Sequence, residues 1–153
     1  MINIEVDPAT ERALRAALRK LSASVERKIV KQSIHRAANP IAKDMKGRLP
    51  TKRSSSTGNL RKSIGKRTKK YPSGVVVTVV GPRRRFGRHG HLVEFGTGPR
   101  WDLTKRVPKY TGIMPARPFA RPAYMAKRRE SLHMAISLMW QKIRQEAAKN
   151  ANR

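Results

Sequence analysis

The 153-residue chain contains no cysteine, which excludes disulfides and thiol chemistry and removes the usual ligands of structural zinc sites. It begins with MINIEVDPATERAL, which has no basic segment followed by an apolar run, so we predict no secretory signal. The longest apolar run, VVVTVV at 75–80, is too short to span a bilayer. We therefore expect a protein that is made and kept in a cytoplasm-like compartment.

Large apolar side chains are also scarce, since aromatic residues make up 5% of the chain and all hydrophobic residues 38%. The core must therefore rely on aliphatic residues and methionine. A chain of this length is large enough for one modest core and not for two independent ones. We predict a single domain over residues 1–153, with a core that is thin for so much charge.

Acidic residues are few: nine Asp and Glu stand against 36 Lys and Arg, which gives a formal net charge of +27. A protein with this imbalance repels itself, and a polyanion or a partner of opposite charge relieves the repulsion. DNA, RNA and an anionic membrane surface are all candidates, because each exchanges bound counterions for protein cations. The net charge alone does not choose among them.

The shortage of acids also argues against catalysis. Metal-dependent nucleases and phosphotransferases need clustered carboxylates, and only Glu94 and Asp102 are neighbours in a predicted loop. His89 and His91 have no third ligand nearby and are better read as solvated loop residues than as a metal site. The serine run at 54–56 lacks the strand-to-helix context of a nucleophile. We therefore expect no enzyme, no cofactor and no metal site.

Helical periodicity predicts a long helix near each end of the chain. In residues 8–38 apolar residues recur at steps of three and four, and Asp7 can cap the first turn. The pattern runs on to about residue 48 with a bend near Pro40, because proline interrupts the backbone hydrogen bonding. The second helix, from about 118 to 150, carries an apolar stripe that packs on the first helix or on another chain.

Between these helices the sequence predicts a small antiparallel sheet and two exposed loops. The segment GVVVTVVGP, 74–82, is dense in β-branched residues and pairs with 63–71 across a short turn. Both faces of this strand are apolar, so we expect it inside a sheet, or between a sheet and helices or a subunit neighbour. Residues 49–59 and 82–117 are predicted as partner-contacting loops, with a short helix at HLVEF, 91–95. This order favours an α+β domain with the long C-terminal helix packed on one face of the sheet.

The middle of the chain has an unusual charge pattern, because residues 45–93 carry fourteen Lys or Arg and no acid. A solvated surface usually mixes both signs. The three arginines directly after the predicted strand suit contacts with phosphates that do not read sequence, while the scarcity of aromatic residues disfavours an RNA or single-strand platform. The residues expected to contact DNA or an acidic partner are Lys69, Lys70, Arg83, Arg84, Arg85 and Arg88.

Three short sequence motifs flank the valine strand. TGNLRKSI (57–64) precedes it, and HLVEFGTG (91–98) and MPARPFARPA (114–123) follow it. Together they resemble the tail-completion or neck-protein family of long-tailed bacteriophages, over roughly residues 10 to 145. Residues 51–56 are extra relative to the usual pattern, in which this loop is commonly shorter. The three motifs carry the resemblance together and in this order.

The resemblance implies a non-enzymatic structural subunit of the virion neck, assembled in the host cytoplasm as a ring, expected to be a hexamer. Its partners would be other copies of itself, neighbouring head-connector and tail-terminator or tail-tube proteins, and the packaged double-stranded DNA in the channel, with no membrane. The charge leaves one alternative open, a free basic nucleic-acid-binding protein of histone-like or ribosomal type. A third idea, a nuclease, would need Glu94 as a catalytic group.

Glu94 is the only acidic residue between Asp44 and Asp102, and we expect it to act as a clamp. Val93 and Phe95 would anchor the segment, while the Glu94 carboxylate accepts hydrogen bonds from an arginine or from backbone amides of the turn that follows. Gly96 permits backbone angles that other residues resist, and Phe119 is expected to be a buried anchor. The residues predicted to form this motif or an interface are Glu94, Phe95, Gly96, Thr97, Arg117, Pro118, Phe119 and Arg121, with Arg117 and Arg121 as the candidate partners of Glu94.

Overall fold

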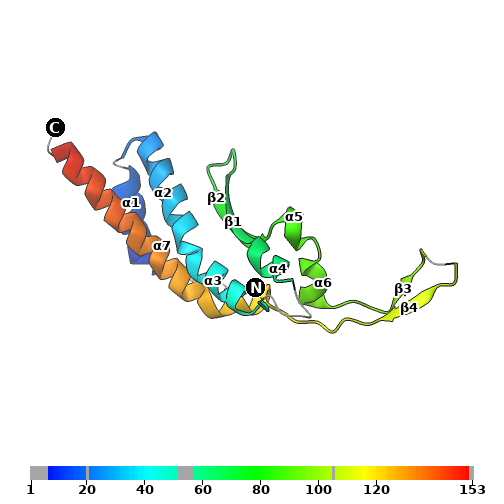
Figure 1. Ribbon diagram of the computed structural model, residues 1–153. Coiled ribbons are helices and arrows are strands. Elements are labelled where there is room, and N and C mark those ends of the chain that lie inside the picture. Colours follow the sequence, from blue (N-terminus) through cyan, green and yellow to red (C-terminus); the bar gives the residue numbers. More distant parts are fainter. Residues whose placement is uncertain (1–6, 20, 52–56, 105, 152–153) are drawn as a thin grey trace. The chain divides into compact units, whose positions relative to one another are not determined.

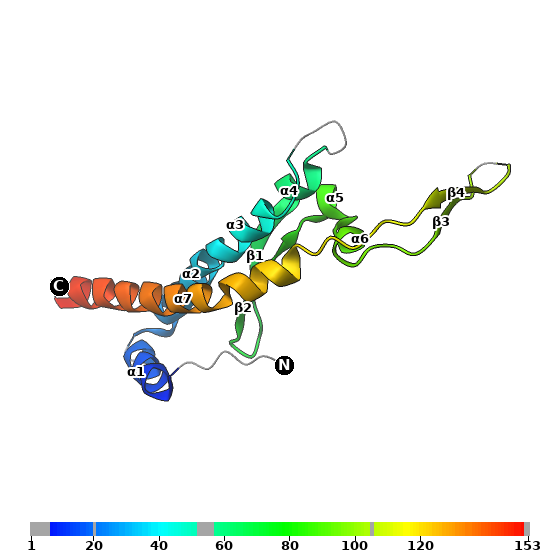
Figure 2. The same cartoon turned by 90° about the horizontal axis from the view of Figure 1, so that it is seen from below.

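The computed structural model describes residues 7–19, 21–51, 57–104 and 106–151, which form helices and two small sheets (Figure 1). The elements in chain order are α1 (Pro8–Arg19), α2 (Ala23–Ala37), α3 (Asn39–Gly47), α4 (Asn59–Ser63), β1 (Ile64–Lys70), β2 (Val76–Pro82), α5 (Arg84–Gly87), α6 (Gly90–Phe95), β3 (Arg100–Asp102), β4 (Lys109–Gly112) and α7 (Ala120–Ala151). The predicted α+β class, with a small antiparallel sheet in the middle and a long C-terminal helix, is confirmed (Figure 2).

The contacts divide the chain into two compact units. The first comprises Met1–Pro40, Lys66–Val79 and Lys127–Arg153, and the second comprises Ile41–Gly65 and Val80–Ala126. Each unit has its own cluster of buried apolar side chains. The single modest core expected from the sequence is thus replaced by two smaller clusters.

The N-terminal helical region is broken twice. Asp7 caps α1, since its Oδ2 accepts hydrogen bonds from the backbone N–H and the hydroxyl of Thr10, both at 3.0 Å. The uninterrupted helix predicted over 8–38 is wrong, because Ser22 is extended (φ −62°, ψ 145°) and α2 starts after it. Serine suits such a cap position better than a helix interior. The predicted interruption of the helix near Pro40 is confirmed, since α2 ends at Ala37 and α3 begins at Asn39.

The first unit is built on the packing of α7 against α1 and α2. Its buried residues are Leu18, Ile29, Met139 and Ile143, surrounded by partly buried aliphatic residues and Trp140. A side-chain hydrogen bond from Lys142 Nζ to Gln32 Oε1, at 2.7 Å, also joins α7 to α2. The predicted packing of the C-terminal stripe on the first helical segment is therefore confirmed within this chain.

The second unit has a core drawn from α3, α4, the start of β1 and the first turn of α7. Its buried residues are Met45, Leu49, Leu60, Ile64, Phe119 and Ala123. Leu49 corrects the expectation of an exposed loop over 49–59, because it is 4% exposed and its carbonyl accepts a hydrogen bond from Arg61 Nη1 at 3.1 Å. Residues 52–56 of that predicted loop, including Lys52 and Arg53, lie outside the described residues.

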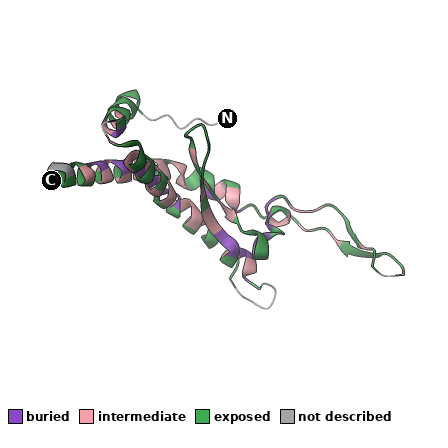
Figure 3. Ribbon diagram, turned by 90° about the horizontal axis from the view of Figure 1, so that it is seen from above, coloured by how far each residue is buried: buried purple, intermediate pink, exposed green. Residues whose placement is uncertain are grey.

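The valine strand pairs with the segment predicted for it. β1 and β2 form a two-stranded sheet, closed by a hydrogen bond from Tyr71 N to Val75 O at 2.9 Å and by Gly74 at φ +83°. Of the settings expected for this strand, the inside of a larger sheet is not found among the described residues, whereas cover by a subunit neighbour stays a prediction. Val75, Val77 and Val79 are 54%, 38% and 61% exposed, because no third described strand joins this sheet. Figure 3 shows exposed and half-buried stretches along much of the described chain.

Residues 82–117 are more ordered than the predicted loop. They contain α5, α6 and the antiparallel β3–β4 hairpin, in which Trp101 lies opposite Tyr110 and Asp102 opposite Lys109. The helix expected at HLVEF is confirmed as α6. The other elements have only three or four residues each, which is too short for hydrophobic periodicity to reveal. Among the described helices, none is long and apolar enough to cross a membrane.

Candidate functional site

Glu94 lies on α6 and holds the start of α7. Its side chain is buried, and its Oε2 accepts hydrogen bonds from the backbone N–H groups of Phe119 and Ala120 at 2.7 and 2.9 Å. Its Oε1 accepts a third from the N–H of Arg121 at 3.0 Å. The first N–H groups of a helix have no partner within the helix, and a negative charge is favoured at that end. The Glu94 carboxylate thus caps α7 from another element.

Further backbone hydrogen bonds join the two flanking segments. Arg117 N donates to Val93 O at 2.8 Å, and Thr97 N donates to Met114 O at 2.9 Å. The Thr97 hydroxyl accepts a hydrogen bond from Met114 N at 3.1 Å. We call the segments 93–97 and 114–121, joined in this way, the Glu94 clamp. The clamp thus brings together the sequence motifs HLVEFGTG (91–98) and MPARPFARPA (114–123).

The partners of Glu94 differ from those expected. The donors are the amides of residues 119–121 and not those of the turn at 96–98. Arg121 contributes its backbone N–H, and among the described residues neither Arg117 nor Arg121 forms an ion pair with Glu94. Arg117 and Pro118 are exposed. The signal that could have found these donors is the predicted start of the last helix, where unpaired N–H groups must be satisfied.

The environment of Glu94 sets its protonation. Burial raises the pKa of the carboxyl, but the three backbone hydrogen bonds together lower it by more than burial raises it. The pKa therefore lies below its ordinary value of 4.5. Glu94 is therefore ionised at neutral pH. With three donors already bound to a buried carboxylate, it is poorly placed to act as a general base.

A pH titration should reveal this capping charge. The pKa of Glu94 is lower in the folded than in the unfolded state. The ionised Glu94 therefore contributes its full stabilisation above pH 4.5, and this stabilisation is lost as the pH falls through the folded-state pKa. Glu94→Gln removes this ionisation, so the difference in unfolding free energy between wild type and variant should narrow below pH 4.5. Urea unfolding across the acid range measures it, and a difference that stays constant with pH would contradict the capping role.

Gly96 is required in the clamp by both conformation and space. Its φ is +76°, and an added Cβ would lie 2.9 Å from Ala116 N and from Met114 O. We expect Gly96→Ala to lower the unfolding free energy by about 1–3 kcal/mol, measured by urea unfolding. Gly98→Ala is the matched control, because nothing lies within 4 Å of that Cβ and no unusual φ is needed. Equal losses in the two variants would rule out a special role for Gly96.

The two phenylalanines of the predicted motif have opposite environments. Phe119 is 2% exposed and packs in the core of the second unit. Phe95 is 80% exposed, so the expectation that it anchors the segment is wrong. In a helix, side chains two residues apart point in nearly opposite directions, and here Val93 contacts the core while Phe95 faces away from it.

The basic residues singled out from the sequence are all exposed. Lys69 and Lys70 end β1, where Lys69 Nζ lies 5.6 Å from the centre of the Tyr71 ring. Arg83, Arg84, Arg85 and Arg88 lie in or beside α5. Arg83 passes over the backbone of Gly65, where any larger side chain would collide with its guanidinium. The four arginines therefore share one short helical turn and its flanks.

The β3–β4 hairpin exposes an apolar surface that the sequence reasoning missed. Trp101 and Tyr110 pack ring against ring with centroids 5.2 Å apart, yet they are 57% and 48% exposed. Leu103, Val107 and Ile113 are more exposed still. We call these five residues the hairpin patch. A hairpin of this kind is at best marginally stable alone, so its apolar side chains are suited to contact a partner.

The described residues contain no group of three or more His, Asp or Glu side chains that could hold a metal ion. Asp102, the acid nearest to Glu94 in sequence, accepts hydrogen bonds from the N–H and hydroxyl of Thr104 at 3.1 and 2.6 Å. These bonds hold the pKa of Asp102 below its ordinary value. Both acids of the predicted loop thus fix local backbone structure.

Comparison with known proteins identifies the family. No curated protein and no solved structure matches the chain. A family model described as "Bacteriophage HK97-gp10, putative tail-component" matches residues 12–96, which is more than half of the chain. The match includes α6 with Glu94. It agrees with the resemblance that the motifs TGNLRKSI and HLVEFGTG indicated. The chain therefore belongs to the HK97-gp10-like family of bacteriophage tail components.

Proposed function

We propose that this tail component is a ring-forming neck subunit that completes the tail and joins it to the head connector around the DNA channel. The observation that carries the proposal is the hairpin patch, an exposed apolar surface on a chain from a family of virion structural proteins. In this reading residues 1–153 form one non-enzymatic structural part. The segments 49–59 and 82–117 contact neighbouring virion proteins.

Incomplete burial supports assembly with other copies of the chain. The valine face of β2 and the hairpin patch are both exposed, and each would favour aggregation if it stayed uncovered. A contact between two different surfaces of neighbouring copies forms a closed ring when the rotation between them closes. We infer a hexamer from the resemblance to neck proteins. Assembly would then stabilise each subunit, because the neighbour binds only the folded chain.

The charge supports anionic neighbours. Six copies with a formal charge of +27 each would repel one another unless anionic groups lie close by. Packaged duplex DNA and acidic surfaces of the adjacent head-connector and tail proteins can supply them. The exposed cations at Lys69, Lys70 and around α5 are the proposed contacts.

A phage that lacks this protein tests the proposal. We expect filled heads and separate tails that fail to join, and restoration of joining when the purified protein is added. Normal virions in its absence would contradict the neck assignment. Electron microscopy of the purified protein tests the ring separately, with rings expected and a uniform monomer contradicting it.

The hairpin patch should matter for assembly and not for folding. We expect Trp101→Ala combined with Tyr110→Ala to change the unfolding free energy little, because both side chains are largely exposed. Ring formation and infectious titre should fall by about tenfold or more, since aromatic side chains dominate interfaces. Tyr124→Ala is the matched control, because Tyr124 is also 48% exposed but lies on α7. Wild-type titre in the double variant would contradict a role for this patch.

The alternative, a free nucleic-acid-binding protein, is favoured by the acid-free stretch at 45–93. It predicts that the isolated chain binds DNA or RNA tightly and that affinity falls steeply as the salt concentration rises. It also predicts no rings and no place in the virion. Mass spectrometry of purified virions decides between the two, since a free binding protein would be absent from them.

A further inference from the structure

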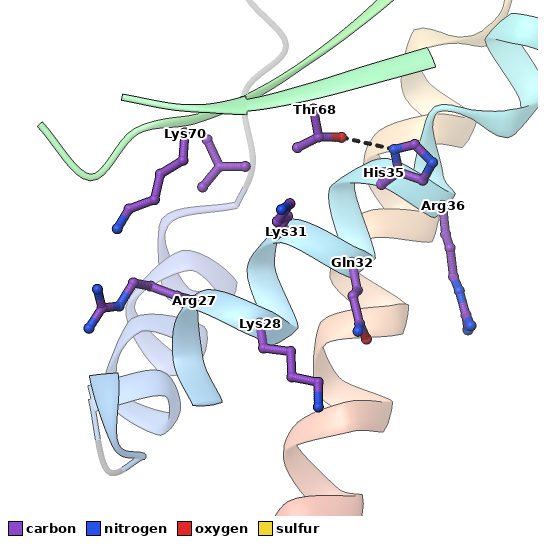
Figure 4. Close-up of a pocket in the computed structure, with 9 residues that line it drawn as sticks. Arg27, Lys28, Lys31, Gln32, His35, Arg36, Thr68 and Lys70 are labelled. Atoms are coloured by element: carbon purple, nitrogen blue, oxygen red, sulfur yellow. Dashed lines mark hydrogen bonds between the residues drawn. The ribbon is translucent and has the colours of Figure 1, made fainter. Parts of the chain in front are cut away.

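The first unit contains a hollow of about 690 Å³ beside α2 and the β1–β2 hairpin (Figure 4). Cationic side chains contribute much of its lining: Arg27, Lys28, Lys31 and Arg36 from α2 and Lys70 from β1. We call it the cationic hollow. Only Lys70 was singled out from the sequence, because nothing there shows that β1 lies beside α2.

The charge of the hollow is of one sign. None of the residues that line it is acidic, and no described carboxylate forms an ion pair with any of its five Lys and Arg side chains. Figure 4 shows Arg27 and Lys70 extending to the same side of the hollow from two different elements. Glu146 lies near Lys28, whose charge, after the hydrogen bond from Lys149, helps to lower the pKa of Glu146. Like charges held together with no acid in the lining nevertheless favour an anionic ligand.

The wall of the hollow is held by a hydrogen-bond chain. His35 Nδ1 is 2.9 Å from the Thr68 hydroxyl (Figure 4). The Thr68 hydroxyl is in turn 2.8 Å from the Thr78 hydroxyl. Lys66 Nζ donates to His35 O at 2.8 Å. Burial, and then the charges of Lys66 and Lys31, hold the pKa of His35 below its ordinary value. The wall therefore joins α2 to β1 in a defined geometry and carries a positive potential.

The shape and lining of the hollow favour a peptide over duplex DNA. Its surface includes Val76, Thr68 and the aliphatic stems of the lysines as well as the charged groups. A duplex is a convex rod whose phosphates are met by cations spread over a broad face, and its apolar thymine methyl groups lie in the groove and not on the phosphate surface. A polypeptide with acidic and apolar side chains matches both the charged and the apolar parts of the lining, because its carboxylates can pair with arginine or lysine while its apolar side chains contact Val76.

We propose that the cationic hollow binds an acidic segment of a neighbouring virion protein. This inference rests on the proposed function only in naming a virion protein as the source of the segment. Carboxylates of the segment pair with Arg27, Lys31 and Lys70, and an apolar side chain between them contacts Val76. Each subunit would thereby gain an anionic partner that offsets part of its excess positive charge.

The test measures how tightly the purified full-length chain binds a fluorescent peptide in which Glu alternates with Leu. Binding is measured by fluorescence anisotropy at physiological ionic strength. The same peptide with Gln in place of Glu, and a short DNA duplex, are the comparison ligands. We expect the acidic peptide to bind more tightly than the Gln peptide, while the duplex shows whether the hollow itself binds phosphates. Lys31→Glu combined with Lys70→Glu should weaken that binding by about tenfold or more, because two attractive contacts become repulsive.

The matched control is Arg129→Glu combined with Arg144→Glu, which makes the same change in net charge at exposed positions of α7 outside the hollow. Its affinity should change by less than about threefold, because exposed charges at a distance are screened. The milder pair Lys31→Gln and Lys70→Gln should give an intermediate loss, and circular dichroism checks that every variant folds. The proposal would be overturned if the hollow pair and the control pair lost equal affinity for the acidic peptide. It would also be overturned if the duplex bound more tightly than the peptide and the hollow pair weakened that duplex binding. Neither result depends on the phage assembly experiment.

Discussion

Replacing Phe119 by alanine is expected to lower the free energy of unfolding by about 3–5 kcal/mol, which is a large part of the stability of a small protein. Phe119 is 2% exposed and packs with Met45, Leu49, Leu60 and Ile64 at the centre of the second unit. Its loss removes the largest buried side chain of that cluster and leaves a cavity that a thin core cannot readily fill. Urea unfolding followed by circular dichroism measures the effect.

Phe95→Ala is the matched control, because it makes the same chemical change at a side chain that is 80% exposed. We expect it to alter the unfolding free energy by no more than about 0.5 kcal/mol. Should Phe119→Ala fail to fold, Phe119→Leu gives a smaller loss that can be measured. Equal effects of alanine at the two positions would show that the core of the second unit is misassigned.

Replacing Glu94 by alanine is expected to destabilise the protein by about 2–4 kcal/mol. The N–H groups of Phe119, Ala120 and Arg121 lose their acceptor, and that of Phe119 is buried away from water. Glu94→Gln retains the shape but places an NH₂ group where one carboxylate oxygen accepts, so its loss should be smaller. Hydrogen exchange at the amides of Phe119, Ala120 and Arg121 should speed up in both variants, because the start of α7 is no longer capped.

Glu130→Gln provides the control for the loss of an exposed carboxylate, because Glu130 lies on α7, the helix that Glu94 caps from α6. Glu130 pairs with Lys127 at 2.7 Å, but the Glu130 side chain is 50% exposed, and exposed pairs contribute about 0–1 kcal/mol. If Glu94→Ala were no more destabilising than Glu130→Gln, the hydrogen bonds of the clamp would carry little of the stability of the fold.

Local sequence patterns predicted the long elements because each depends on few distant contacts. The valine strand and its partner followed from β-branched density and a short turn, and the last helix followed from its apolar stripe. The break at Ser22 escaped notice because the apolar spacing continues across it through Leu21 and Val25. The β3–β4 hairpin was missed because strands of three and four residues carry too little pattern.

The functional features were harder to predict, because they are made by residues far apart in sequence. Glu94 was recognised as a clamp from its isolation among basic residues, but its partners are backbone amides, which every residue has. The exposure of Phe95 depends on how α6 is turned towards the core. The cationic hollow needs Lys70 beside the cations of α2, and only tertiary structure brings them together.

A cryo-electron microscopy reconstruction of the neck of the intact phage would show whether this chain is a neck subunit. We expect a closed ring of this chain between the head connector and the tail, with Trp101 and Tyr110 buried against a neighbouring protein. A neck that lacks the chain, or a ring in which the hairpin patch stays in solvent, would contradict it.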